Sequence, residues 1–311
     1  PWIDPVPEPV DRTWVDRLAG RLAQVRADEA VLFTSFHQSA LPLALVLRMA
    51  GVRRIAAISD DYPGALLDVR HRVPLGIPEP ERALSLAAAA GFPLPAADEP
   101  ILRLRTGSVS AAPAHEALAE PGYVVVHPGS SVDARACPPA VCERIVQALA
   151  AAGHRVAVTG GPGEGGLSAR VAGRHGIDLG GQTSLTGLAA VIARADCLVV
   201  GNTGPAHLAA AVGTPVVSLF APTVPFGQWG PYRIPAVRLG DAAAGCRHTR
   251  ATTCPVPGHP CLSQVEPSGV VDAVRLLRRP RGRMAAAPAR SAESATSAES
   301  ATSAESAGGR R

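Results

Sequence analysis

Residues 197–220, CLVVGNTGPAHLAAAVGTPVVSLF, decide the fold of this chain. An apolar run leads into Gly-Asn-Thr-Gly, a segment of small residues follows, and a second apolar run ends the stretch. Two apolar strands joined by a short helix predict a βαβ unit with parallel strands and a right-handed crossover. The loop after the first strand then lies at the carboxyl edge of the sheet, where folds of this kind bind their ligands.

The same alternation of strands and helices extends from this unit toward both ends of the chain. Apolar runs and helical periodicity predict strands at 30–36, 54–58, 123–127, 155–159, 177–179, 197–200 and 215–220, and helices at 15–25, 39–49, 83–90, 139–151, 167–175, 185–195 and 205–212. This order predicts an α/β fold built from doubly wound parallel sheets.

Two domains and a tail are expected. Residues 1–115 are predicted to form a first Rossmann-like domain, 120–280 a second one, and 284–311 a tail. Residues 106–122 lack periodicity and hold the predicted linker. Only about two strands are predicted before this linker, so the first domain is expected to be incomplete. The tail repeats Ser-Ala-Glu-Ser-Ala-Thr without any large apolar side chain, which predicts disorder.

The composition favours α/β layers and argues against several classes of protein. Of the 311 residues, 47% are hydrophobic but only 4% are aromatic, so Ala, Val and Leu must build the core. The net charge of +4 is too small and too dispersed to indicate nucleic-acid binding. No apolar run reaches the ~18 residues that a membrane span requires. The six cysteines form no short disulfide framework, which indicates a reducing compartment and a cytoplasmic protein.

Two further patterns leave alternatives open. Five arginines lie close together near the end of the predicted second domain, namely Arg275, Arg278, Arg279, Arg281 and Arg283. They fit a solvated helix end, or a peripheral contact with an anionic membrane face. Residues 246–261, CRHTRATTCPVPGHPC, hold three Cys and two His, but their spacing is not that of the usual zinc knuckles. Cysteines of a loop near the cleft are the preferred interpretation, and no metal site is assigned.

Five predicted strands of the second half end in loops of similar character. The loops are HPGSS (127–131), TGGPGEGG (159–166), GGQTS (180–184), GNTG (201–204) and APT (221–223). Glycine permits close backbone approach to a ligand, and Ser and Thr add hydroxyl donors. In a parallel sheet all five loops lie at one edge, which indicates a phosphate-bearing ligand.

The helix predicted after Thr203 strengthens this interpretation. Its N–H groups at Thr203, Gly204 and Ala206 are expected to be free to bind phosphate with the help of the helix dipole. His207 lies in the first turn, where it can add a donor. The alternative is that the Gly-Pro sequence only turns the chain and that His207 packs beneath a loop.

In order and spacing, three segments resemble glycosyltransferase family 9, the ADP-heptose heptosyltransferases of lipopolysaccharide core synthesis. They are VVVHPGSSVDAR…CP, VAVTGGPGE, and the long run from LGGQTS to APTVP. HQSALPLALVLRMAGVRRIAAISDD resembles the acceptor-side domain of the same family. The resemblance covers about residues 30–277. It implies the GT-B architecture, in which two Rossmann-like domains face a cleft, and an inverting transfer that uses a nucleotide-sugar donor and no metal or other cofactor.

The resemblance also implies roles for residues of the loops. Ser130 and Ser131 match the hydroxyl pair on the donor phosphates, and Arg135 stands where the family usually has Lys. Glu164 matches the acid near the ribose, and Thr183 lies where the base is contacted. Together with Gly161 and Ser184 of the same loops, the expected donor-binding residues are Ser130, Ser131, Arg135, Gly161, Glu164, Thr183, Ser184, Asn202, Thr203, Gly204 and His207.

Three departures from the family pattern bear on activity. Asn202 replaces an acid, and the Trp of the Lys-Arg-Trp-Pro stretch is absent. The strand and Gly-Asp loop that carry the catalytic Asp are not in this sequence, so no general base is assigned and little transfer is expected. Asp60 and Asp61 are the nearest substitutes by residue type, although they follow a later strand.

Other functions remain open at this point. A non-catalytic nucleotide-binding module would keep the donor pocket without the chemistry, and a GT-B-like sugar-nucleotide epimerase would need an acidic or His base. A dinucleotide-dependent dehydrogenase is disfavoured, because no G-x-G-x-x-G motif follows a first strand with an acid about twenty residues later. The expected partners are a nucleotide sugar and a glycan or glycolipid acceptor of unassigned identity.

Overall fold

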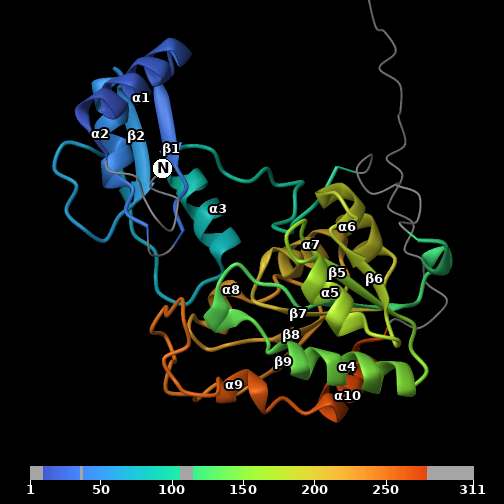
Figure 1. Ribbon diagram of the computed structural model, residues 1–311. Helices are drawn as coiled ribbons and strands as arrows, with labels where there is room; N and C mark the ends of the chain where they lie inside the picture. The colour runs from blue at the N-terminus through green and yellow to red at the C-terminus, as the bar shows by residue number, and fades with distance from the viewer. Residues whose placement is uncertain (1–9, 36–37, 106–114, 279–311) are drawn as a thin grey trace, which may run out of the picture. The chain divides into compact units, whose positions relative to one another are not determined.

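The computed structural model describes residues 10–35, 38–105 and 115–278, which contain two separate parallel sheets (Figure 1). Residues up to Arg278 belong to one compact unit. The predicted tail and three arginines of the basic cluster (Arg279, Arg281 and Arg283) lie outside the described residues, as does most of the predicted linker. The domain boundaries near 115–120 therefore stay a prediction.

The larger sheet has six strands in the order β6-β5-β4-β7-β8-β9, all parallel. Its strands are β4 (Val124–His127), β5 (Val156–Gly160), β6 (Ile177–Gly180), β7 (Cys197–Gly201), β8 (Val216–Leu219) and β9 (Ala236–Leu239). Its helices are α4 (Pro139–Ala151), α5 (Gly165–Ala172), α6 (Leu185–Ala193), α7 (Gly204–Val212), α8 (Phe226–Trp229), α9 (Pro260–Ser263) and α10 (Pro267–Leu277), with short 3-10 turns at Glu116–Leu118 and Asp133–Arg135.

Two buried clusters cover the two faces of this sheet. Val124 and Val126 of β4 pack into one cluster together with residues of α4, α5 and α10. Val125, which points to the opposite face, packs with residues of α6 and α7. Burial on both faces explains why the strands read as continuous apolar runs instead of alternating with polar residues. The predicted doubly wound arrangement is confirmed.

The smaller sheet has three parallel strands in the order β1-β2-β3. Its strands are β1 (Glu29–Leu32), β2 (Arg54–Ile58) and β3 (Val69–His71), and its helices are α1 (Arg12–Val25), α2 (Leu41–Met49) and α3 (Glu79–Ala89). One small core lies against α2 and another against α3. None of the residues of α1 is buried.

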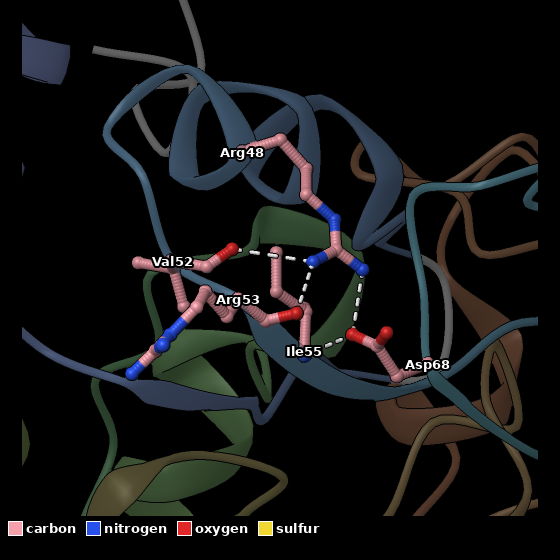
Figure 2. A network of polar contacts seen from close by, with 5 residues as sticks. All are labelled: Arg48, Val52, Arg53, Ile55 and Asp68. Atoms are coloured by element: carbon pink, nitrogen blue, oxygen red, sulfur yellow. Dashed lines mark hydrogen bonds and ion pairs between the residues drawn. The ribbon is translucent and has the colours of Figure 1, made fainter.

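A polar network ties α2 to the small sheet (Figure 2). The Arg48 guanidinium donates to the carbonyls of Val52 and Arg53 and to Asp68, whose Oδ2 lies 2.6 Å from Nη2. The same oxygen accepts the N–H of Ile55 at 2.7 Å. These contacts hold the pKa of Asp68 below its ordinary value, with the Ile55 N–H as the largest cause.

Two strands were missed by the sequence prediction, and both are edge strands. β3 raises the small sheet to three strands instead of the expected two, and β9 ends the large sheet. β3 contains Arg70 and His71, and β9 contains Arg238, so neither has a continuous apolar run. Edge strands tolerate such residues because only one flank is paired.

Among the described residues, none of the helices is both long and apolar enough to cross a bilayer. Arg278, from the predicted basic cluster, pairs with Asp196 at 3.0 Å, and Arg275 pairs with Asp272 at 3.2 Å.

Candidate functional site

Glu164 joins the loops that follow β4 and β5. Its Oε2 accepts the N–H of Gly161 at 2.7 Å, within its own loop. The carboxylate also lies against the backbone of Gly129, where a Cβ would come within 2.2 Å of Oε1. Only glycine fits at 129 without moving Glu164. One carboxylate oxygen of Glu164 therefore organises its loop, and the other has no hydrogen-bond partner among the described residues.

The loop after β6 joins the same row of loops. The N–H of Gly181 donates to the carbonyl of Gly160 at 3.0 Å, and the Gly181 backbone approaches Pro162 closely. Gly181 has a φ of +69°, a left-handed conformation that suits glycine. Thr183, which follows in this loop, is half-buried.

Arg135 joins the loop after β7 to the row. Its carbonyl oxygen lies 3.0 Å from the position of a Cβ on Gly201, the residue before Asn202. Burial lowers the pKa of the Arg135 guanidinium from its ordinary value. Its Nε is buried and, within the described part of the chain, has no hydrogen-bond partner. A guanidinium in such a place is available to an anion.

Asn202 is the second polar residue with an unused donor here. It is 7% exposed, and its Nδ2 is buried without a partner among the described residues. Buried polar groups in native proteins are nearly always paired, and an unpaired one calls for an explanation. A ligand that accepts from Nδ2 would supply one.

The start of α7 differs from the sequence prediction. Thr203 donates its N–H to Gly201, and Ala206 donates its N–H to Thr203, at 3.0 and 3.1 Å. These two N–H groups are therefore not free, because the tight turn at the start of the helix uses them. The N–H of Gly204 is the one of the three that remains without an acceptor among the described residues.

His207 lies in the first turn of α7 and is half-buried. Burial lowers its pKa, so the imidazole is neutral at pH 7. A neutral imidazole can donate one hydrogen bond from the nitrogen that carries the proton.

Three predicted hydroxyl residues have different surroundings. Ser130 Oγ takes part in a local turn with Val132, at 3.2 to 3.3 Å. Ser131 is exposed. Ser184 Oγ accepts the N–H of Gly187 at 3.1 Å and thereby caps α6. Ser184 is thus explained by helix capping, and Ser131 remains freely accessible.

The sequence prediction did not identify a buried polar pair formed by His127 and Thr159 on strands β4 and β5. His127 ends β4, and its Nδ1 lies 3.0 Å from Thr159 Oγ1 on β5. Its Nε2 lies 4.0 Å from Glu164, but burial lowers the His127 pKa against the opposing effect of that carboxylate. Burial therefore favours the neutral form of His127, close to Glu164. A histidine at the end of a buried strand was the available signal.

Asp60 and Asp61 follow β2 in the small sheet, at its carboxyl edge. Together with Thr34, which follows β1, they line a cavity. Arg70 holds their loop, because its guanidinium donates to the carbonyls of Ser59 and Asp60. Two carboxylates therefore lie beside a cavity on an anchored loop.

The cysteine-rich stretch at 246–261 was considered from the sequence as a possible zinc site. Cys246 and Cys261 are buried and Cys254 is half-buried. Among the described residues, no group of three or more His, Cys, Asp or Glu side chains is arranged to hold a metal ion. Cys137, Cys142 and Cys197 lie in the core, as their strand and helix faces predict.

The structure is similar to several solved glycosyltransferases. It matches E. coli ADP-heptose lipopolysaccharide heptosyltransferase II with a TM-score of 0.62 and 20% identity, covering 87% of this chain and 82% of that one. A family 9 glycosyltransferase from Veillonella parvula gives a TM-score of 0.65 at 16% identity, with 86% and 80% covered. The E. coli heptosyltransferase WaaC with ADP-2-deoxy-2-fluoro heptose gives 0.59 at 18% identity, with 84% and 77% covered. The chain has the GT-B fold that its sequence resemblance implies.

Curated relatives match over shorter stretches. Lipooligosaccharide heptosyltransferase 2 of Campylobacter jejuni subsp. jejuni serotype O:2 is 28% identical over 96 residues, which are 31% of this chain and 30% of that protein. Lipopolysaccharide heptosyltransferase 3 of Escherichia coli is 33% identical over 107 residues, which are 32% of each. The matched stretches thus span about a third of the length of these relatives.

The family model for glycosyltransferase family 9 (heptosyltransferase) matches residues 15–259, well over half of the chain. This range includes both sheets and every residue of the loop row described above. The chain belongs to glycosyltransferase family 9.

Proposed function

We propose that this protein transfers a sugar, heptose by analogy with its family, from a nucleotide-diphosphate donor to a glycan or glycolipid acceptor. The observation that carries the proposal is the row of four loops that follow β4, β5, β6 and β7, which we call the donor row. Its loops are joined by the Gly181–Gly160 hydrogen bond and by the close contacts of Glu164 with Gly129 and of Arg135 with Gly201. Two of its side chains, Arg135 and Asn202, present buried donors without partners among the described residues. A diphosphate sugar supplies acceptors for both.

In this proposal each part of the row has one task. Arg135 neutralises the departing diphosphate, which stabilises the charge that develops as the sugar leaves. The Gly204 N–H and the dipole of α7 add to that stabilisation. Glu164 accepts a ribose hydroxyl with its second oxygen. Asn202 and neutral His207 hydrogen-bond the sugar, and half-buried Thr183 lies beside the base.

Transfer with inversion also needs a general base for the acceptor hydroxyl. Asp60 and Asp61 are the first positions to test, because they lie on an anchored loop beside a cavity. Asp60→Asn and Asp61→Asn should lower turnover by about 10²–10⁴-fold if one of them is the base. Loss of turnover with an unchanged affinity for ADP would separate a base from a binding residue.

Calorimetry with ADP and UDP tests the donor part of the proposal. Heat from ADP with the folded protein is expected, with weaker or no heat from UDP. Release of ADP from ADP-heptose in the presence of candidate acceptor glycans then tests transfer. The release is expected to persist in EDTA, and the anomeric configuration of the product, read by NMR, is expected to be inverted. Folded protein that binds neither nucleotide would refute the proposal.

A nucleotide-binding module without chemistry is the second candidate, and Asn202 favours it. The acid that the family pattern places there is replaced by a neutral amide, whereas the replacement of Lys by Arg135 keeps the positive charge. ADP binding without any ADP release would favour this candidate. We also expect a cytoplasmic protein that meets its acceptor at a membrane face; flotation with anionic vesicles against neutral ones tests that contact.

A further inference from the structure

A further cavity lies at the carboxyl edge of the large sheet, at the loops that follow β8 and β9. Its volume is about 570 Å³, within the usual range of small-molecule sites. It is bounded by the loop after β8, residues 222–227, and by the segment at 242–248. The donor row described above follows β6, β5, β4 and β7 instead. None of the residues that line the cavity belongs to those four loops, although the loop after β8 neighbours the loop after β7.

Arg238 is one of the residues that line this cavity. Its guanidinium carbon lies 5.2 Å from the ring centroids of both Phe220 and Phe226. The two rings are packed edge to face, with centroids 4.9 Å apart and an interplanar angle of 86°. A guanidinium in cation–π contact with aromatic rings can still form hydrogen bonds with its N–H groups. Its buried Nε has no partner among the described residues.

The lining carries positive charge without a carboxylate. Arg247 and His248 also line the cavity, and His248 contacts the loop after β8. Burial and the nearby charge of Arg247 both lower the pKa of Arg238, and Asp241 partly opposes them. Within the described residues, neither Arg238 nor Arg247 has an acidic partner within 4.0 Å. Two guanidinium groups at close quarters repel each other unless an anion lies between them.

Backbone hydrogen bonds connect the segment that carries Arg247 and His248 to the loop after β8. The N–H of His248 donates to the carbonyl of Pro222 at 2.8 Å, and the N–H of Arg250 donates to that of Thr223 at 2.9 Å. His248 and Arg250 have φ values of 60° and 57°, the left-handed region that non-glycine residues rarely adopt. Two backbone hydrogen bonds therefore connect this segment to the loop after β8.

We infer that this cavity binds a sugar phosphate. Two guanidinium groups suit a phosphate ester, which accepts several charge-assisted hydrogen bonds and carries close to two negative charges. The cavity is much larger than a phosphate alone, and Phe226, Val224 and Ala242 give it apolar walls. Such walls fit the C–H faces of a sugar that carries the phosphate. This site is independent of the donor row and of sugar transfer.

The test uses glucose 6-phosphate as probe, with the full chain and saturating ADP to occupy the donor row. Calorimetry is expected to show binding of glucose 6-phosphate, and weaker or no binding of glucose. Arg247→Gln should weaken the binding by at least about tenfold, the effect of losing a hydrogen bond to a charged group. Arg238→Gln should weaken the binding further, and the melting temperature of this variant checks that it still folds.

Arg275→Gln is the matched control, because it removes one exposed arginine of the same half of the chain. Its affinity for glucose 6-phosphate should stay within twofold of the original. The inference is overturned if glucose 6-phosphate does not bind, or if the control loses as much affinity as Arg247→Gln. It is also overturned if glucuronate binds as tightly as glucose 6-phosphate, or if ADP displaces glucose 6-phosphate. Arg247 is exposed, so its substitution leaves the test valid even where Arg238→Gln fails to fold.

Discussion

The two sheets of this protein share a parallel topology but differ in how completely they are buried. The six-stranded sheet is covered on both faces, and Val124, Val125 and Val126 of its central strand are each no more than 1% exposed. The three-stranded sheet has two small cores, and its helix α1 contributes no buried residue. The difference shows where rigidity is needed. The loops that form the donor row stand on the better-packed sheet.

Leucine truncation in matched helices would have the largest effect and tests this comparison directly. Leu149 of α4 is fully buried against the large sheet, and Leu47 of α2 is 7% exposed in the small core. Both changes to Ala remove the same atoms, at a cost of roughly 2–5 kcal/mol in unfolding free energy. Leu149→Ala is expected at the upper end of that range and Leu47→Ala at the lower end.

Urea unfolding followed by hydrogen-exchange mass spectrometry would assign each loss to its own sheet. A larger chain with two sheets need not unfold in one step, so exchange should be read separately for each sheet. Equal losses for the two variants would contradict the proposed difference in packing.

Arg135→Ala should have the next largest effect, on ligand affinity instead of stability. If the guanidinium pairs with the diphosphate, the change should weaken ADP binding by about 1.5–3 kcal/mol. Calorimetry checks this, with Arg144→Ala as control because Arg144 is an exposed residue of α4. An unchanged affinity would remove Arg135 from the donor row. The unfolding free energy should change little in either variant.

Gly180→Ala should destabilise the large sheet where it supports the donor loops. A Cβ at this position would lie 2.5 Å from Ser168 Cβ and 3.0 Å from Gly165 Cα, which belong to α5. Backbone must move to relieve such contacts, at a cost of roughly 1–3 kcal/mol. Gly163→Ala is the control, because a Cβ there meets nothing within 4 Å. Thermal unfolding should leave the control within about 0.5 kcal/mol. A control as destabilised as Gly180→Ala would mean that loss of glycine itself is the cause.

Asp68→Asn should have the smallest effect, and it tests the small sheet. The folded pKa of Asp68 is lowered, so the carboxylate stabilises the fold above the unfolded pKa of about 3.8. That stability is lost as the pH falls through the lower, folded pKa. The side chain is 41% exposed, so water screens the Arg48 pair, and the contribution should remain below about 1 kcal/mol.

Unfolding free energies of the original and Asp68→Asn proteins, compared between pH 2.5 and 6, give the measurement. Their difference should be present at the upper end of this range and shrink at the lower end. A difference that does not change with pH would assign the effect to packing instead of charge.

Local sequence patterns determined a large part of the fold. The strand over 54–58 and the helix over 139–151 coincide with β2 and α4, because continuous burial and helical periodicity leave strong apolar signals. The glycine-rich loops were also recognisable, since parallel strands place their carboxyl ends at one edge. β3 and β9 were not, because an edge strand with an arginine lacks the burial that creates an apolar run.

What only the tertiary structure decided is which atoms of these loops are already in use. The sequence by itself determined the α/β class, the row of loops and the residues that resemble family 9. It did not show that Ser184 caps α6 or that the Glu164 carboxylate lies against Gly129. It also did not show that the N–H groups of Thr203 and Ala206, at the start of α7, are already hydrogen-bonded within that turn. It also gave no sign that the Arg238 guanidinium lies 5.2 Å from the ring centroids of Phe220 and Phe226, or that Arg238 and Arg247 line the same cavity. Periodicity reports which residues are buried, whereas a hydrogen bond or an unpaired charge depends on distances between segments that only folding brings together.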